Sequence, residues 1–190
     1  SDPTGDTSNG KTIVDSGPNQ LHGTCTGCSG FTGEGIDPEV AGIVGYDDAQ
    51  WFNGTDTYVD IAPDNLKFGS NDFEIEASIV IGSINGTTGN DIISFYDGTN
   101  DQRSFIFKVD ATGTLSFLTN TDGTGAANTV SKGDTALSLN TKYNVKVTKS
   151  GTALTFWVNG VSDGVRVVGA TLFTPTILTK AAIGANLIQT

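Results

Sequence analysis

Apolar and polar residues alternate with a period of two along much of the chain. In four runs the apolar residues take every second position, and these runs are 73–81, 105–109, 143–147 and 154–158. Because successive side chains of a strand point to opposite faces, each run predicts a β-strand with one face toward a core. No comparable run has the spacing of an amphipathic helix. The pattern therefore predicts an all-β protein.

Turn-forming residues interrupt the strand-like runs about every ten positions. Asn159-Gly160 and Asn85-Gly86 directly follow two of the runs, and Asn-Gly pairs favour the positive φ values of two-residue hairpin turns. Many short strands without intervening helices predict an antiparallel two-sheet β-sandwich or jelly roll. The chain has no internal repeat and no linker, so residues 1–190 are predicted to form one domain, with irregular segments at 1–12 and in the Gly-rich stretch 23–45.

Composition and charge narrow the range of partners. The chain has 190 residues, of which 36% are hydrophobic, and its 10 Lys and Arg against 21 Asp and Glu give a net charge of −11. The apolar content is sufficient for a core. A chain this acidic, without a cluster of basic residues, does not suit nucleic acid or anionic lipid. No apolar run is long enough to cross a bilayer. We therefore expect neither a nucleic-acid partner nor membrane insertion.

Five segments in order carry a family pattern. They read VDSGPNQLHGT at 14–24, AQWFNGTDTYVDI at 49–61, FEIEASI at 73–79, LNTKYNVKV at 139–147 and LTFWVNGV at 154–161. Together they resemble the laminin G-like branch of the concanavalin A-like lectin/glucanase superfamily, which implies a jelly-roll sandwich. Ser78 stands where the family carries a Trp. The family also continues into a further strand after Gly184, which predicts that this strand is missing here or is supplied by another chain.

The resemblance also implies a class of function. The family is usually non-catalytic and binds glycans or protein partners, often with calcium, in extracellular proteins and on viral surfaces. We therefore predict an extracellular recognition or adhesion module that binds carbohydrate. One alternative is a structural or decorating module of a virion, filament or cell surface that assembles with itself or docks on a carrier particle. A second alternative is a glycoside hydrolase.

Exposed aromatic side chains are the candidates for sugar binding, because sugars stack on aromatic faces. If Leu154 and Phe156 point inward, Trp157 points outward, and Tyr58 alternates with Val59 in the same way. Covering a sheet against a loop is the alternative role for each aromatic residue. The candidate ligand-binding residues are Trp157, Tyr58, Asn159 and Trp51, with Tyr46 and Tyr96 as further loop-adjacent aromatics.

Calcium is the candidate metal, because Asp-rich loops supply the oxygen ligands that it prefers. The family resemblance points to Asp15 first, and the pairs Asp97 with Asp101 and Asp47 with Asp48 are further candidates; turn capping by the same side chains is the alternative.

Cys25 and Cys28 predict a short disulfide in an oxidising compartment, with free thiols or a metal site as alternatives.

Three carboxylates raise the possibility of catalysis. Asp72, Glu74 and Glu76 occupy alternate positions of a predicted strand and so share one face. Retaining glycosidases use two such groups about 5 Å apart. The order Asp-x-Glu-x-Glu, however, differs from the Glu-x-Asp-x-Glu of the related glucanases, and a polar strand face explains the pattern. The single His22 lies in a turn-rich segment without a Gly-x-Ser-x-Gly motif, so we predict no catalytic residues.

Overall fold

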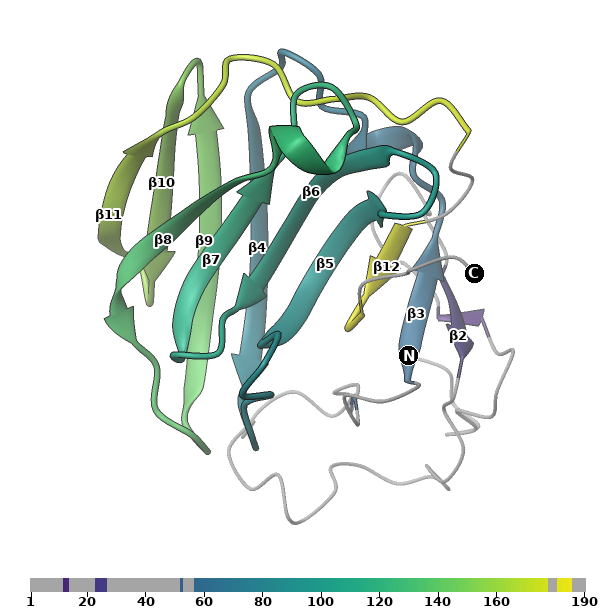
Figure 1. The fold of residues 1–190 in the computed structure, drawn as a ribbon. Helices are drawn as coiled ribbons and strands as arrows, with labels where there is room; N and C mark the ends of the chain where they lie inside the picture. The colour runs from purple at the N-terminus through teal and green to yellow at the C-terminus, as the bar shows by residue number, and fades with distance from the viewer. Residues whose placement is uncertain (1–11, 14–22, 27–51, 53–56, 178–180, 186–190) are drawn as a thin grey trace.

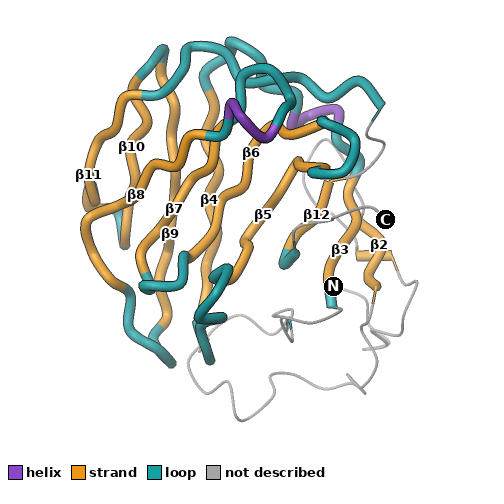
Figure 2. The backbone as a smooth tube through the Cα atoms, in the orientation of Figure 1, coloured by secondary structure: helices purple, strands orange, loops and turns teal. Residues whose placement is uncertain are grey.

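The computed structural model describes residues 12–13, 23–26, 52, 57–177 and 181–185. Figures 1 and 2 show that these residues form two β-sheets that face each other. The larger sheet has the strand order β1 (Thr12–Ile13), β2 (Gly23–Thr26), β3 (Tyr58–Ile61), β12 (Ala181–Ile183), β5 (Asn90–Asp97), β6 (Gln102–Val109), β7 (Thr114–Thr119) and β8 (Thr129–Ala136). The smaller sheet has the order β11 (Val161–Val167), β10 (Ala153–Val158), β9 (Lys142–Ser150) and β4 (Phe73–Val80).

The predicted all-β, antiparallel two-sheet sandwich is confirmed. Every strand pairing in the described part of the chain is antiparallel. The only helical turns there are the short 3-10 segments Asp64–Leu66 and Gly125–Ala127. No helix in these residues is long and apolar enough to span a membrane. Strand β12 lies between β3 and β5, so Ala182 pairs with Asp60 on one side and Ser94 on the other.

The core lies between the sheets and is dominated by phenylalanine. Phe117 on β7 is fully buried, and its ring centroid lies 5.5 Å from that of Phe105 and 6.1 Å from that of Phe107. Phe73 on β4 of the smaller sheet approaches the same ring at 5.7 Å. Phe68 stacks on Phe73 with a centroid distance of 4.2 Å. Rings from both sheets therefore form one aromatic cluster, as the strand alternation requires.

Two turn predictions have different outcomes. Asn159 and Gly160 have φ values of 49° and 79° and join β10 to β11, which confirms the two-residue hairpin turn. The same prediction for Asn85-Gly86 is wrong, because β4 ends at Val80 and β5 begins at Asn90. There the Asn85 Oδ1 atom accepts hydrogen bonds from the backbone N–H groups of Thr87 and Thr88, at 3.0 and 3.2 Å. The side chain therefore closes its own turn within a longer loop.

The predicted irregular segments also need correction at their edges. Thr12 belongs to strand β1, and Gly23–Thr26 forms strand β2, which pairs with β1 and β3. A side chain at Gly23 would meet the Val59 side chain and the Asp60 carbonyl oxygen. Glycine therefore allows β2 to approach β3 closely, a use that its loop-like composition concealed.

Asp110 closes the turn between β6 and β7. Its Oδ1 atom accepts hydrogen bonds from the backbone N–H groups of Thr112, at 2.8 Å, and Thr114, at 3.1 Å, and its carboxylate pairs with Lys132. Burial alone would raise the pKa of Asp110. The ion pair with Lys132 and the hydrogen bonds outweigh burial and hold the pKa at about 2. This buried turn therefore keeps its negative charge at neutral pH.

Asp91 on β5 is also shielded from solvent, but its pKa is shifted in the opposite direction from that of Asp110. It lies opposite Lys108 in the strand register, but the Lys108 ammonium donates to the Thr88 carbonyl oxygen at 2.9 Å instead. Burial raises the pKa of Asp91 from 3.8 to about 6, although the charge of Lys108 partly opposes the shift. Between about pH 4 and 6, the folded protein therefore keeps the Asp91 proton that the unfolded chain has already released. The free energy of unfolding accordingly falls as the pH rises through that range.

Asp91→Asn is expected to stabilise the protein at pH 7. The substitution removes a charge that the fold solvates poorly, so the free energy of unfolding should rise by about 1–3 kcal/mol. The gain should shrink toward zero as the pH is lowered to 4. Urea unfolding followed by circular dichroism measures both values. The control is Asp64→Asn, whose carboxylate is 81% exposed and should change stability by less than about 0.5 kcal/mol. An Asp91→Asn variant that is less stable than wild type at pH 7 would contradict this account.

Candidate functional site

The strand alternation gives the smaller sheet a solvent-facing side, which we call the outer face. Leu154 and Phe156 on β10 are fully buried, and Val145 and Val147 on β9 likewise face the core. The residues between them point the other way. The outer face consists of Glu74, Glu76 and Ser78 on β4, Asn144, Lys146 and Thr148 on β9, Ala153, Thr155 and Trp157 on β10, and Ser162, Val165 and Val167 on β11.

Trp157 occupies the centre of the outer face and is half-buried there. Its indole Nε1 atom donates a hydrogen bond to Thr148 Oγ1 at 3.1 Å. The Lys146 ammonium lies 5.5 Å from the centroid of the indole ring, within cation–π range. Two contacts from the neighbouring strand thus hold the indole across the sheet surface. The ring is fixed before any ligand arrives, which reduces the entropy cost of binding.

Polar side chains surround this indole on the β4 side. Lys146 Nζ lies 3.3 Å from Glu74 Oε2 and opposite Glu76 in the strand register. Ser78 Oγ donates to Asn144 Oδ1 at 2.6 Å. The Glu74 side chain is 55% exposed, so its carboxylate can also accept hydrogen bonds from a ligand. The outer face therefore combines an aromatic platform with donors and acceptors in one plane.

The other predicted ligand-binding residues are placed differently. Asn159 lies next to the outer face, but its Oδ1 atom accepts the backbone N–H of Asn144 at 2.9 Å and so braces the end of β10. Tyr58 lies on β3 of the larger sheet, beside buried Val59, and is not brought together with Trp157. Trp51 lies outside the described residues, as does Tyr46.

Asp72, Glu74 and Glu76 do not act as equivalent carboxylates. Asp72 lies just before β4 and accepts hydrogen bonds from the Gly151 N–H at 2.7 Å and the Ser150 hydroxyl at 2.9 Å. These hydrogen bonds, the one from Gly151 first, lower the pKa of Asp72. Asp72 therefore closes the turn between β9 and β10. Glu74 and Glu76 remain on the outer face.

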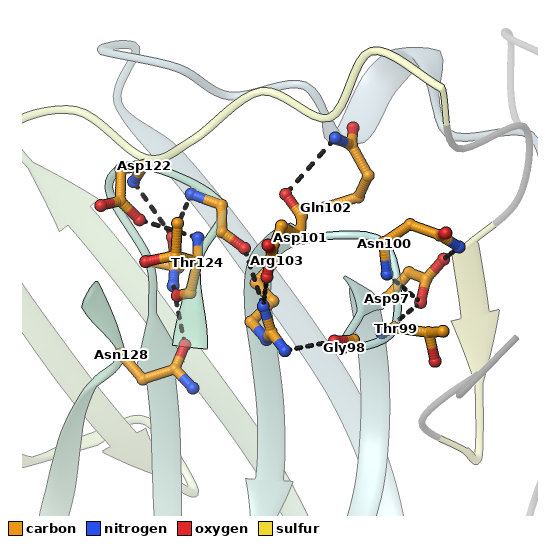
Figure 3. A network of polar contacts seen from close by, with 12 residues as sticks. Asp97, Gly98, Thr99, Asn100, Asp101, Gln102, Arg103, Asp122, Thr124 and Asn128 are labelled. Carbon is orange, nitrogen blue, oxygen red and sulfur yellow. Dashed lines mark hydrogen bonds and ion pairs between the residues drawn. The ribbon is translucent and has the colours of Figure 1, made fainter. Parts of the chain in front are cut away.

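Asp97 and Asp101 lie at one end of the larger sheet, in the network of Figure 3. Asp97 is buried and accepts the Thr99 N–H at 2.8 Å and the Asn100 side-chain amide at 2.7 Å. Asp101 pairs with Arg103. Among the described residues, no group of three or more His, Cys, Asp or Glu side chains could hold a metal ion. Asp15, Asp47 and Asp48 lie outside these residues, so the calcium site stays a prediction.

Arg103 joins two loops that no pattern in the sequence connects. Besides Asp101, its guanidinium donates to the carbonyl oxygens of Gly98 and Gly123 and lies 5.7 Å from the centroid of the Tyr96 ring. Tyr96 in turn accepts a hydrogen bond from Asn128 at 3.1 Å. The donors of this network are used within the protein, which indicates that it braces the fold and leaves the outer face as the better candidate site. The Asp, Asn and Gly content of both loops predicted turns but not their contact.

Cys25 lies on β2, fully buried and in contact with Val59. It is disulfide-bonded. Cys28 and His22 lie outside the described residues, so the pairing of Cys25 with Cys28 stays a prediction.

The chain matches the model of a known protein family. A laminin G family model, described as the concanavalin A-like lectin/glucanases superfamily, matches residues 53–187. The chain belongs to this superfamily. The resemblance predicted from the five sequence segments is thereby confirmed. No curated protein gives a significant match to the chain.

Three solved structures resemble the chain to different degrees, all at low sequence identity. The Ruminococcus gnavus IT-sialidase CBM40 bound to alpha2,3 sialyllactose has a TM-score of 0.53 and 17% identity, covering 66% of this chain and 69% of that one. The HCR/D W1238A mutant has a TM-score of 0.50 and 13% identity, covering 94% of this chain and 39% of that one. The carbohydrate-binding module CBM66 from Bacillus subtilis has a TM-score of 0.41 and 17% identity, covering 68% and 78%.

Proposed function

We propose that the chain is a non-catalytic, extracellular glycan-binding module that receives sugar on its outer face. The observation that carries the proposal is the indole of Trp157, held in the middle of a solvent-facing sheet by Thr148 and Lys146. A sugar ring offers an apolar C–H face for stacking and hydroxyl groups at its edge. The outer face meets these needs with Trp157 and with the carboxylate of Glu74.

The arrangement of the carboxylates supports binding over hydrolysis. A glycosidase needs one carboxyl group as acid and a second as base or nucleophile, in different environments. Here Asp72 is bound to the turn between β9 and β10, and Glu74 contacts Lys146. The partners of both groups favour the ionised carboxylate, whereas a catalytic acid needs surroundings that keep it protonated. The disulfide at Cys25 supports an oxidising, extracellular compartment.

Tryptophan fluorescence on the intact chain tests the proposal. The chain has two tryptophans, so Trp51→Phe leaves Trp157 as the single tryptophan. Titration with soluble polysaccharides should change this emission in a saturable way, and calorimetry should give the same affinity. Repeating the titration with a calcium chelator tests the predicted metal. If none of the polysaccharides binds and the chain self-associates through the exposed valines of β11, the structural module is favoured instead. On that strand Val167 is 83% and Val165 56% exposed.

A further inference from the structure

We infer that the outer face selects neutral glycans and discriminates against glycans that carry carboxylate or sulfate groups. The inference rests on the proposed function and concerns the charges around Trp157. An acidic sugar needs an uncompensated cation beside the stacking ring, because its anion must give up water. A basic group that already has an anionic partner in the protein cannot supply this cation.

The two arginines of the sequence are both ion-paired. Arg103 contacts Asp101 and two backbone carbonyl groups in the network of Figure 3, and its side chain is 14% exposed. Arg166 on β11 pairs with Asp134 on β8 and also donates to the Val165 carbonyl oxygen at 3.0 Å. Arginine is the residue best suited to bidentate recognition of a sugar carboxylate. In this protein both guanidinium groups bind carboxylate and carbonyl groups of the chain itself.

The lysine nearest to the indole is also compensated. Lys146 contacts Glu74 at 3.3 Å and the ring of Trp157, and its side chain is 28% exposed, against 55% for Glu74. Glu76 is its register partner and is exposed as well. Glu74 therefore neutralises Lys146, and Glu76 leaves this part of the outer face with a net negative charge. Sugar hydroxyl groups can donate to these carboxylates, whereas an anionic substituent is repelled.

The net charge of the whole chain acts in the same direction. At −11 it lowers the rate at which anionic ligands approach and opposes their binding at low ionic strength. Because Lys146 neutralises Glu74, the carboxylate of Glu76, several ångströms away in a high-dielectric surface, should favour a neutral glycan about threefold over its singly charged counterpart. The preference should decrease as salt is added.

Matched ligand pairs test this inference on the intact chain. The pairs are a neutral oligosaccharide that the chain binds and the same oligosaccharide carrying one sialic acid or one sulfate. Calorimetry at about 50 mM and about 500 mM salt, where the Debye length is about 14 Å and about 4 Å, should give a neutral preference of about threefold that falls with salt. Glu76→Gln should remove most of the preference, since it removes the uncompensated carboxylate. Asp64→Asn removes an equal charge away from the outer face and should leave the ratio unchanged.

The outcomes separate the inference from the function on which it rests. An acidic member that binds as well as its neutral counterpart, or better, overturns the inference and leaves glycan binding in place. A ratio that responds equally to Glu76→Gln and Asp64→Asn also overturns it, because the discrimination would then come from net charge and not from the outer face. Absence of binding to any oligosaccharide rejects the proposed function and the inference with it.

Discussion

Replacing Trp157 with alanine is expected to weaken glycan binding by at least about tenfold. Among the described residues, the indole is the single aromatic surface of the outer face, and Thr148 and Lys146 hold it in place. Truncation removes the stacking surface and the cation–π contact of Lys146, which keeps only its ion pair with Glu74. The fold should persist, because Trp157 points away from the core while Phe156 beside it is fully buried. Calorimetry with the best polysaccharide measures the change.

Two further variants show how the indole acts. Trp157→Phe keeps an aromatic face and should retain part of the affinity. Thr148→Val removes the hydrogen-bond acceptor of the indole N–H and should weaken binding by about three- to fivefold by loosening the ring. Circular dichroism spectra that match wild type would show that each variant is folded. An unchanged affinity in Trp157→Ala would place the glycan on another surface.

Phe117→Ala is expected to lower the free energy of unfolding by about 3–5 kcal/mol. Phe117 is fully buried, and its ring meets those of Phe73, Phe105 and Phe107. Truncation leaves a cavity between the two sheets, which cannot collapse without moving strands of both. Urea unfolding at pH 7 measures the loss.

The matched control lies on the neighbouring strand. Val130 on β8 is 53% exposed and faces solvent opposite Leu118 on β7, so Val130→Ala should change stability by less than about 0.5 kcal/mol. If Phe117→Ala lowered stability no more than this control, the aromatic cluster would not join the sheets as described.

Local patterns sufficed to predict much of this fold. The alternation in β10 places Leu154 and Phe156 inside and Trp157 outside, and the Asn159-Gly160 pair predicts the hairpin that follows. Both are properties of a few neighbouring residues, so they can be worked out from the sequence. Alternation cannot assign a strand to a sheet, however. It therefore offered no means of separating Tyr58, on the larger sheet, from Trp157, on the smaller one.

The contacts that the sequence did not reveal join distant segments. Asn128 donates to Tyr96 from 32 positions away, and Arg103 reaches Gly123 across 20. No period or motif specifies such pairs, because they depend on which loops the sheet order brings together. Asp91 and Asp110 illustrate the same limit for charge. Asp91 lies opposite Lys108 in the strand register, and Asp110 pairs with Lys132. The pKa of Asp91 is nevertheless raised, whereas that of Asp110 is lowered.

The position of β12 also has a mechanical consequence. In the described part of the chain, Ala181–Ile183 is the strand that connects β3 to β5. It pairs with β5 through Ala182 and Ile183, and one further backbone hydrogen bond joins the Gly184 N–H to the Ile92 carbonyl oxygen at 3.0 Å. On one side lie the short strands β1–β3, and on the other the longer ribbon β5–β8. A force that separates the two parts acts on this narrow seam first, and a local opening that begins there can release β1–β3 while the aromatic cluster remains packed.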